Sequence, residues 1–230
     1  MDILDKRQNE TTREFAIRNL KHNIINLNLY PGYQMSANDL AMEMGLSKTP
    51  VREALNELSH VDIVEIYPQK GSCVAKIDYD LVEEARFIRY TLESAIVTSA
   101  CDIADQVDLT PLEENIKLQE FYFQNGNLTK LLELDNAFHQ AIFQLVNKSR
   151  TYKLMDSMLI HFDRVRSMSL SSVKEIKIVA DHKAILTAIQ KKDKEKAKEV
   201  MLKHLNRYKI DKEYIEEKYP EYFKVDNDRY

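Results

Sequence analysis

Apolar residues recur every three to four positions along most of this 230-residue chain, which is the period of amphipathic helices. The first such segment covers residues 12–27 and ends at the Tyr-Pro-Gly sequence of residues 30–32. Two short helical segments then meet across a tight turn at Gly45, and Ser36 and Ser47 precede them as predicted N-caps. The pattern therefore predicts one long helix followed by a helix-turn-helix.

The helical pattern gives way to short strand-like runs after the second short helix. The sequences IVEIY (residues 63–67) and SCVAKI (residues 72–77) flank a turn at residues 68–71 and predict a β-hairpin. A helix, a helix-turn-helix and a hairpin, in this order, form a winged helix-turn-helix. We therefore predict such a domain over residues 1–77.

Only helical periodicity remains from residue 80 onward. Residues that favour caps and turns divide this part into six predicted helices, at residues 80–104, 110–124, 128–146, 150–168, 173–191 and 193–217. A charged, tyrosine-rich tail follows, in which Pro220 must break any helix. The predicted fold class is mainly α: the winged helix-turn-helix domain, then an all-α six-helix bundle over residues 78–230.

Composition narrows the class of protein. The chain has only 4 Gly and 5 Pro, too few for the many turns of an all-β or Rossmann-type fold. Cys73 and Cys101 lack CxxC spacing, so a disulfide framework and a thiolate zinc site are not expected, and a reducing cytoplasm fits. No stretch approaches the roughly 20 apolar residues of a membrane span. The net charge of −4 means that any DNA binding must depend on a local motif.

Such a motif lies at the start of the second short helix, which is the predicted recognition helix. The N-terminal end of a recognition helix faces base edges and phosphates. A guanidinium can contact guanine O6 and N7 together, so we expect Arg52 to read a base. Lys48 suits a guanine or a phosphate, and the neighbouring hydroxyls suit phosphates. The hairpin turn is predicted to form a wing tip near the backbone or the minor groove. The predicted DNA-contacting residues are Ser47, Lys48, Thr49, Arg52, Lys70 and Gly71.

The segment LAMEMGLSKTPVREALNEL, with Pro-Gly before it and a hairpin ending in KGSCV after it, resembles the GntR family of bacterial regulators. The resemblance covers residues 12–77, and residues 47–55 are similar to the family's signature at the recognition helix. The departures from the family pattern are Lys48 in place of Arg, Leu27 and Asp62 in place of Gly, and Asn38 near a position that is often basic. These departures bear on base preference more than on the fold.

Four side chains suited to metal ligation occur in the predicted bundle. Asp135 and His139 are four residues apart, so they project from one face of a helix. His182 and His204 lie on the last two predicted helices, and an antiparallel turn at residues 192–193 would place them at the same level. Three imidazoles and one carboxylate suit Zn²⁺, Ni²⁺, Co²⁺ or Mn²⁺, with one or two positions left for water or a ligand.

This set resembles the metal-binding form of the FCD (FadR C-terminal) ligand domain over about residues 80–210, and all four positions match. The resemblance implies a small organic acid as effector. Arg89 is a candidate anchor for a second carboxylate, although a structural pair with Glu93 explains it equally well. Arg164 and Arg166 either line the pocket or belong to an exposed face of alternating charge.

These expectations combine into a ligand-responsive transcriptional regulator, by default a repressor. Residues 1–76 hold nine basic and ten acidic side chains, so one domain alone should bind weakly, and a homodimer on an inverted repeat of duplex DNA is expected. One alternative is a metal-dependent enzyme that activates water at the Asp/His cluster. It lacks a general base placed by any motif, so we expect no enzyme. The other alternative is a metal-independent regulator of the same family that binds an acyl-type ligand.

Overall fold

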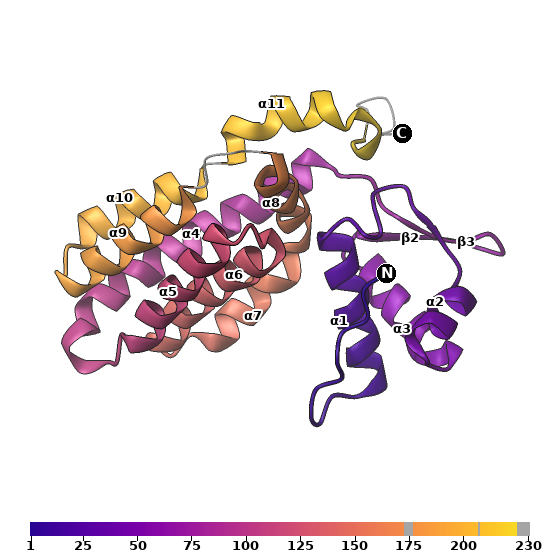
Figure 1. The fold of residues 1–230 in the computed structure, drawn as a ribbon, viewed down its shortest axis with the longest axis horizontal. Helices are drawn as coiled ribbons and strands as arrows, with labels where there is room; N and C mark the ends of the chain where they lie inside the picture. Colours follow the sequence, from indigo (N-terminus) through magenta and orange to yellow (C-terminus); the bar gives the residue numbers. More distant parts are fainter. Residues whose placement is uncertain (173–176, 207, 225–230) are drawn as a thin grey trace. The chain divides into compact units, whose positions relative to one another are not determined.

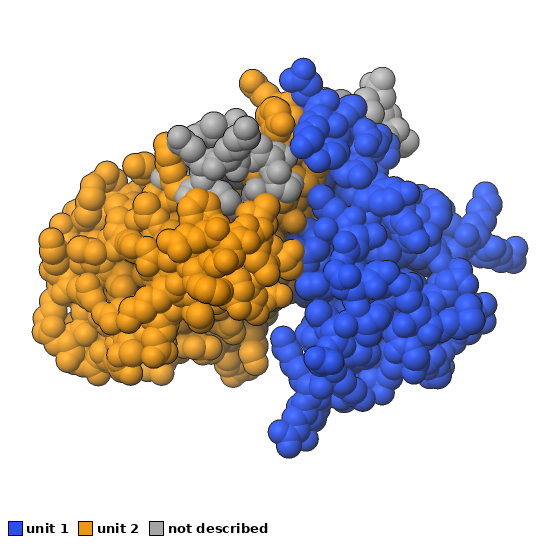
Figure 2. Space-filling model, in the orientation of Figure 1, with its two compact units in different colours: residues 1–82, 216–230 blue, residues 83–215 orange. Residues whose placement is uncertain are grey.

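The computed structural model describes residues 1–172, 177–206 and 208–224 of the chain. Two compact units are present, and Figure 2 distinguishes them by colour. Unit 1 comprises residues 1–82 and 216–230, and unit 2 comprises residues 83–215. The chain therefore passes from one unit to the other twice. The predicted division at residue 77 stays a prediction.

The N-terminal part of unit 1 is a winged helix-turn-helix, as predicted. Its elements are α1 (Thr12–Ile25), β1 (Gln34–Met35), α2 (Ala37–Met44), α3 (Lys48–Ser59), β2 (Val64–Tyr67) and β3 (Gly71–Val74), labelled in part in Figure 1. The strands form an antiparallel sheet in the order β1-β3-β2. The predicted hairpin is β2 and β3, whereas β1 was not predicted because two residues are too few to show a pattern.

Packing against α1 orients the recognition helix. α1 packs on α3, and the fully buried side chains include Leu20 of α1 and Val51, Ala54 and Leu58 of α3. Because these α3 residues recur at helical spacing, the opposite face of α3 is exposed to solvent. The amphipathic pattern of α3 thus determines which side chains are available to a partner.

Two positions with left-handed backbone coincide with the departures from the family pattern. Leu27 has φ +62° after α1, and Asp62 has φ +56° after α3. Gly adopts this conformation without strain, whereas a side chain costs about 1–2 kcal/mol there. The chain therefore keeps the backbone that a Gly would favour and carries strained residues in it.

Unit 2 and the end of the chain are helical. The helices are α4 (Tyr79–Ile103), α5 (Thr110–Gln124), α6 (Leu128–Leu145), α7 (Ser149–Met158), α8 (Ile160–Ser172), α9 (Ile178–Gln190), α10 (Lys194–Leu205) and α11 (Tyr208–Lys218), with short 3-10 turns at Ala104–Gln106 and Pro220–Tyr222. The mainly α class is confirmed. The predicted number of helices is wrong, because the six expected segments become eight helices in the described residues.

The difference in number arises at two places. The segment predicted at residues 150–168 divides at Leu159, whose N–H bonds to the carbonyl of Asp156 in a tightened last turn. From Leu159 to Arg166 every residue is buried, so the one-sided pattern of a single amphipathic helix does not continue. The segment predicted at residues 193–217 becomes α10 and α11. Residues 173–176 of the helix predicted at 173–191 lie outside the described residues.

No helix in the described ranges combines the length and the apolar character that crossing a bilayer requires.

Candidate functional site

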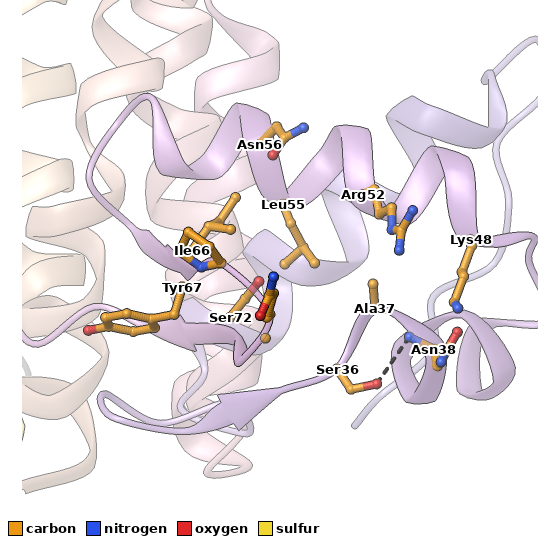
Figure 3. A pocket seen from close by; sticks show the side chains of 13 residues that line it. Ser36, Ala37, Asn38, Lys48, Arg52, Leu55, Asn56, Ile66, Tyr67 and Ser72 are labelled. Atoms are coloured by element: carbon orange, nitrogen blue, oxygen red, sulfur yellow. Dashed lines mark hydrogen bonds between the residues drawn. The ribbon is translucent and has the colours of Figure 1, made fainter.

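A groove of about 500 Å³ separates α3 from the β2-β3 hairpin in unit 1. Figure 3 shows Lys48, Arg52 and Asn56 on α3 along one side of it and Ile66 and Tyr67 of the hairpin on the other. Lys48 and Arg52 are exposed, and neither forms an ion pair within the described part of the chain. Two free cations at the mouth of a groove beside a recognition helix suit an anionic duplex.

The N-terminus of α3 has donors left over for a phosphate. Ser47 occupies the N-cap position, as predicted, but its side chain makes no capping hydrogen bond. In α2, by contrast, the Ser36 hydroxyl accepts from the N–H groups of Asn38 and Asp39 over 3.2 and 3.3 Å. The uncapped N–H groups and the positive end of the α3 dipole both favour an anion.

The structure brings three of the six predicted DNA-contacting residues to this groove, namely Lys48, Arg52 and Gly71. The other three, Ser47, Thr49 and Lys70, are exposed but do not line it. Gly71 also has a structural role: its φ is +102°, and an added Cβ would lie 2.9 Å from the Met35 carbonyl oxygen of β1.

Sequence reasoning did not assign Asn56 and Gln69, which are polar and line the groove from α3 and the wing. Asn56 lies one turn beyond Arg52, so helical spacing could have found it.

The second candidate site is the Asp/His cluster of unit 2. Asp135 and His139 come from α6, His182 from α9 and His204 from α10. One ligand atom from each lies within 4.8 Å of the others, and all four residues are buried. The structure thus gathers all four predicted ligands at one point.

The side-chain atoms that face one another in the cluster are mostly hydrogen-bond acceptors, and few hydrogen-bond donors lie among them. The Nε2 atoms of His139 and His204 lie 3.0 Å apart. The Nε2 atom of His182 lies 3.4 Å from Oδ1 of Asp135, and that of His204 lies 3.7 Å from the same oxygen. Asp135 Oδ1 and His182 Nε2 are buried and have no hydrogen-bond partner among the residues that the structure describes.

A second layer of side chains faces the other nitrogen of each imidazole. Nδ1 of His182 lies 2.7 Å from Oε1 of Gln119, and Nδ1 of His139 contacts Oε2 of Glu93. Nδ1 of His204 lies 3.7 Å from Oδ2 of Asp181. The acceptors beside Nδ1 of His182 and His139 favour the tautomer whose Nε2 carries a lone pair, as in most histidine metal ligands, whereas Asp181 lies too far from His204 for a hydrogen bond. The sequence placed none of these three acceptors beside the ligands.

Burial keeps the imidazoles in the neutral form that a metal ligand requires. It lowers the pKa of His204 to about 3 and the pKa of His182 well below its ordinary value. For His139, burial lowers the pKa more than the Glu93 carboxylate raises it. Burial raises the pKa of Glu93, but the charge of Arg89 and the hydrogen bonds from Arg89 and His139 outweigh it and hold that pKa at about 2.

Buried arginines complete the surroundings of the cluster. Arg89 Nε donates to Oε1 of Glu93 over 2.5 Å, so the structural pair anticipated as an alternative is present. Arg166 contacts Oδ2 of Asp135 and donates to Oδ1 of Asp163 over 2.7 Å. The proposal that Arg164 and Arg166 belong to an exposed face is wrong, because these two residues are 0% and 9% exposed on the buried helix α8.

The cluster fits a divalent transition metal. Three imidazole nitrogens with lone pairs and one carboxylate oxygen form a donor set typical of such ions. Nitrogens each about 2.1 Å from one tetrahedral ion lie about 3.4 Å apart, and the His139 and His204 nitrogens lie 3.0 Å apart, so a small movement would admit an ion. Because arginine occupies Oδ2 of Asp135, the unpaired Oδ1 is the oxygen that remains for an ion. The buried cluster could therefore hold a metal.

Together, the fold and these sites define a DNA-binding protein with a helical domain that contains a buried Asp/His cluster. The family model described as bacterial regulatory proteins, gntR family, matches residues 12–74, and the FCD domain model matches residues 84–207. This chain therefore belongs to the GntR family of transcriptional regulators and carries an FCD domain. The Asp/His cluster agrees with the metal-binding form of that domain.

Relatives along most of the chain support this membership. The HTH-type transcriptional repressor RspR of Escherichia coli K12 is 30% identical over 189 residues, which cover 82% of this chain and 83% of that protein. An HTH-type transcriptional regulator in an unstable DNA locus of Streptomyces ambofaciens is 31% identical over 217 residues, covering 94% and 91%. The solved structure of E. coli McbR/YncC shares the fold, with a TM-score of 0.78, 22% identity, and coverage of 91% of this chain and 99% of that one.

The family assignment decides between the classes considered from the sequence. The chain is a DNA-binding transcriptional regulator that binds DNA through its helix-turn-helix. The family consists of regulators and not of enzymes, so the metal-dependent enzyme is set aside.

Proposed function

We propose that this chain is a homodimeric transcriptional repressor whose helical unit binds a divalent transition metal and a small organic acid. The observation that carries the proposal is the convergence of three histidine Nε2 atoms and an unpaired Asp135 oxygen in a buried cluster. The similarity to RspR, which is named a repressor, supports repression as the mode of action.

Asp135, His139, His182 and His204 are the proposed ligands of Zn²⁺, Ni²⁺ or Mn²⁺. A bound divalent ion supplies a Lewis acid with one or two positions that accept a carboxylate. With one ligand carboxylate the site carries a net charge near +1, which favours an anionic effector in a buried environment. Glu93 and Gln119 orient the imidazoles of His139 and His182 from behind, and the Asp181 carboxylate faces that of His204.

Arg89 is the proposed anchor for the effector carboxylate. Its Nε is engaged by Glu93, but its Nη2 lies 3.7 Å from Asp135 Oδ2, at the edge of the cluster. A guanidinium held by one carboxylate keeps further N–H donors for a second one. Replacement of Arg89 by Ala is expected to weaken effector binding and to spare the metal content.

On the DNA side, we propose that two copies of α3 read the half-sites of an inverted repeat. Arg52 contacts a base, Lys48 a base or phosphate, and Ser47 and Thr49 phosphates, while Lys70 and Gly71 bring the wing to the backbone or minor groove. The nearly balanced charge of residues 1–76 supports a dimer, because one copy supplies little electrostatic affinity.

Two measurements on the full-length protein, purified without chelators, test this function. Elemental analysis should find about one divalent ion per chain, and dialysis against a chelator should lower the melting temperature. Selection from random duplexes should return an inverted repeat, and sedimentation should show a dimer. Protein that contains no metal and does not respond to Zn²⁺, Ni²⁺ or Mn²⁺ would favour the metal-independent acyl-ligand regulator. A monomer with and without DNA would contradict the dimer.

A further inference from the structure

The C-terminal segment pairs with the backbone that follows the winged domain. Ile77 and Phe223 form a parallel β-bridge. The Ile77 N–H donates to the Tyr222 carbonyl over 2.8 Å, and the Lys224 N–H donates to the Ile77 carbonyl over 2.9 Å. We call this pairing of Ile77 with residues 222–224 the clasp.

Side chains make the clasp a packed contact. Ile77 is fully buried and Phe223 is 6% exposed. The rings of Phe223 and Tyr79 stack with centroids 5.1 Å apart, and the rings of Tyr222 and Tyr30 stack at 6.0 Å. Burial of two large apolar side chains stabilises a contact and offsets part of the cost of ordering the chain. The clasp therefore makes the C-terminal segment an integral part of unit 1.

Both chain segments that leave the clasp lead to the Asp/His cluster. On one side, α4 begins at Tyr79 and carries Arg89 and Glu93, and Glu93 contacts Nδ1 of His139. On the other side, α11 precedes the clasp and α10 carries His204 in its last turn. The two connections between the units thus meet at one β-bridge and end at one cluster.

We propose that the clasp transmits the state of the cluster to the DNA-binding unit, an inference that rests on the proposed metal function. Binding at the cluster fixes His204 on α10 and, through His139, Glu93 on α4 relative to each other. Since α4 follows the clasp directly and α11 joins α10 to it, this restraint favours the closed bridge, in which two connections hold the DNA-binding unit. With the bridge open, only the linker holds it. The clasp, closed or open, is then the two-state element that links the Asp/His cluster to the DNA-binding unit.

Hydrogen exchange on the full-length protein, with Zn²⁺ as the probe, tests the proposal. Zn²⁺ is expected to slow exchange of the Ile77 and Lys224 amides at least tenfold relative to chelator-treated protein. Residues 15–20 of α1 lie in the same unit outside the clasp and serve as the internal control, where exchange should stay unchanged.

Matched variants test the role of the clasp independently of metal uptake at the cluster. Phe223→Ala, and a chain that ends after Lys218, should take up Zn²⁺ as the natural chain does but lose the Zn²⁺-dependent protection of Ile77. Glu221→Ala, at an exposed neighbouring position, should keep it. If either disruptive variant fails to fold, the natural chain with and without Zn²⁺ still decides the matter.

The possible failures can be distinguished. If the protein takes up Zn²⁺ but the exchange rate of the Ile77 amide does not change, the role of the clasp is overturned and the metal function stands. The same conclusion follows if amide exchange slows equally in residues 15–20. Absence of Zn²⁺ uptake overturns the proposed metal function and the coupling with it.

Discussion

The Nε2 atoms of His139 and His204 lie 3.0 Å apart, although 65 residues separate them along the chain. Two imidazole nitrogens at this distance attract each other only if a proton or a cation lies between them. When the ring protons lie on the Nδ1 atoms, as ligation of a metal through Nε2 requires, two lone pairs face each other across this distance and repel. A divalent ion at this point would remove that cost.

Replacement of His204 by Leu should accordingly have opposite effects with and without metal. In the presence of chelator, we expect the variant to be as stable as the natural chain or about 1 kcal/mol more stable, because a buried polar group without a donor is removed. Zn²⁺ at about 1,000 times its dissociation constant should stabilise the natural chain by about 4 kcal/mol and the variant far less. Calorimetry with and without Zn²⁺ measures both effects. A variant that still responds fully to Zn²⁺ would remove His204 from the ligand set.

The Gln119 amide should matter for metal affinity without being a ligand. Its Oε1 faces Nδ1 of His182, so Gln119→Leu leaves that imidazole free to adopt the wrong tautomer. We expect a roughly 10- to 100-fold loss of Zn²⁺ affinity with unchanged stoichiometry, measured by competition with a chromophoric chelator. Gln124→Leu on the exposed end of the same helix is the control. Equal affinities of the two variants would show that Gln119 does not orient His182.

Arg52→Ala should abolish specific DNA recognition. Loss of a bidentate base contact costs about 1–3 kcal/mol per half-site, while helix content should be unchanged because Arg52 is exposed and has no ion-pair partner in the described ranges. Binding to the selected inverted repeat, measured by fluorescence anisotropy at fixed salt, tests this. Lys117→Ala on the exposed face of α5 should bind as the natural chain does. Retained affinity in Arg52→Ala would contradict the role assigned to α3.

The left-handed conformation of Asp62 predicts a stabilising substitution. Asp62 is exposed with φ +56°, so Asp62→Gly removes steric strain and should raise stability by about 0.5–1 kcal/mol. Asp62→Ala keeps the strain and loses the local tolerance of Asp for this conformation, so it should be less stable than the natural chain. Thermal unfolding of the three proteins gives the order, and a less stable Gly variant would be the contrary result.

The ion pair between Glu10 and Arg18 predicts a pH dependence. The hydrogen bond from Arg18 lowers the pKa of Glu10 from 4.5 to about 2, so the folded state favours the ionised carboxylate. Its contribution to stability is present above pH 4.5 and is lost as the pH falls toward 2. Glu10→Gln should therefore melt lower than the natural chain at pH 7, and the difference should shrink between pH 5 and pH 3. A difference independent of pH would exclude this linkage.

The DNA-binding half was largely predictable because its signals are local. Periodicity, the Gly45 turn and the motif around Arg52 predict α1, α2, α3 and the hairpin from neighbouring residues alone. The pairing of β1 with β3 was not predictable, because its two residues show no pattern and their partner is supplied by tertiary contact.

In the helical half, sequence alone determined the helical class and the four candidate ligands, since spacing of three to four residues and a symmetric hairpin are properties of the chain itself. Only the tertiary structure decided that α8 is buried on nearly all sides, so that the side chains of Arg164 and Arg166 are buried. It also decided that Glu93, Gln119 and Asp181 face the imidazoles, and that Phe223 returns to Ile77. These contacts join elements far apart in the sequence, and local patterns contain no information about which buried faces meet.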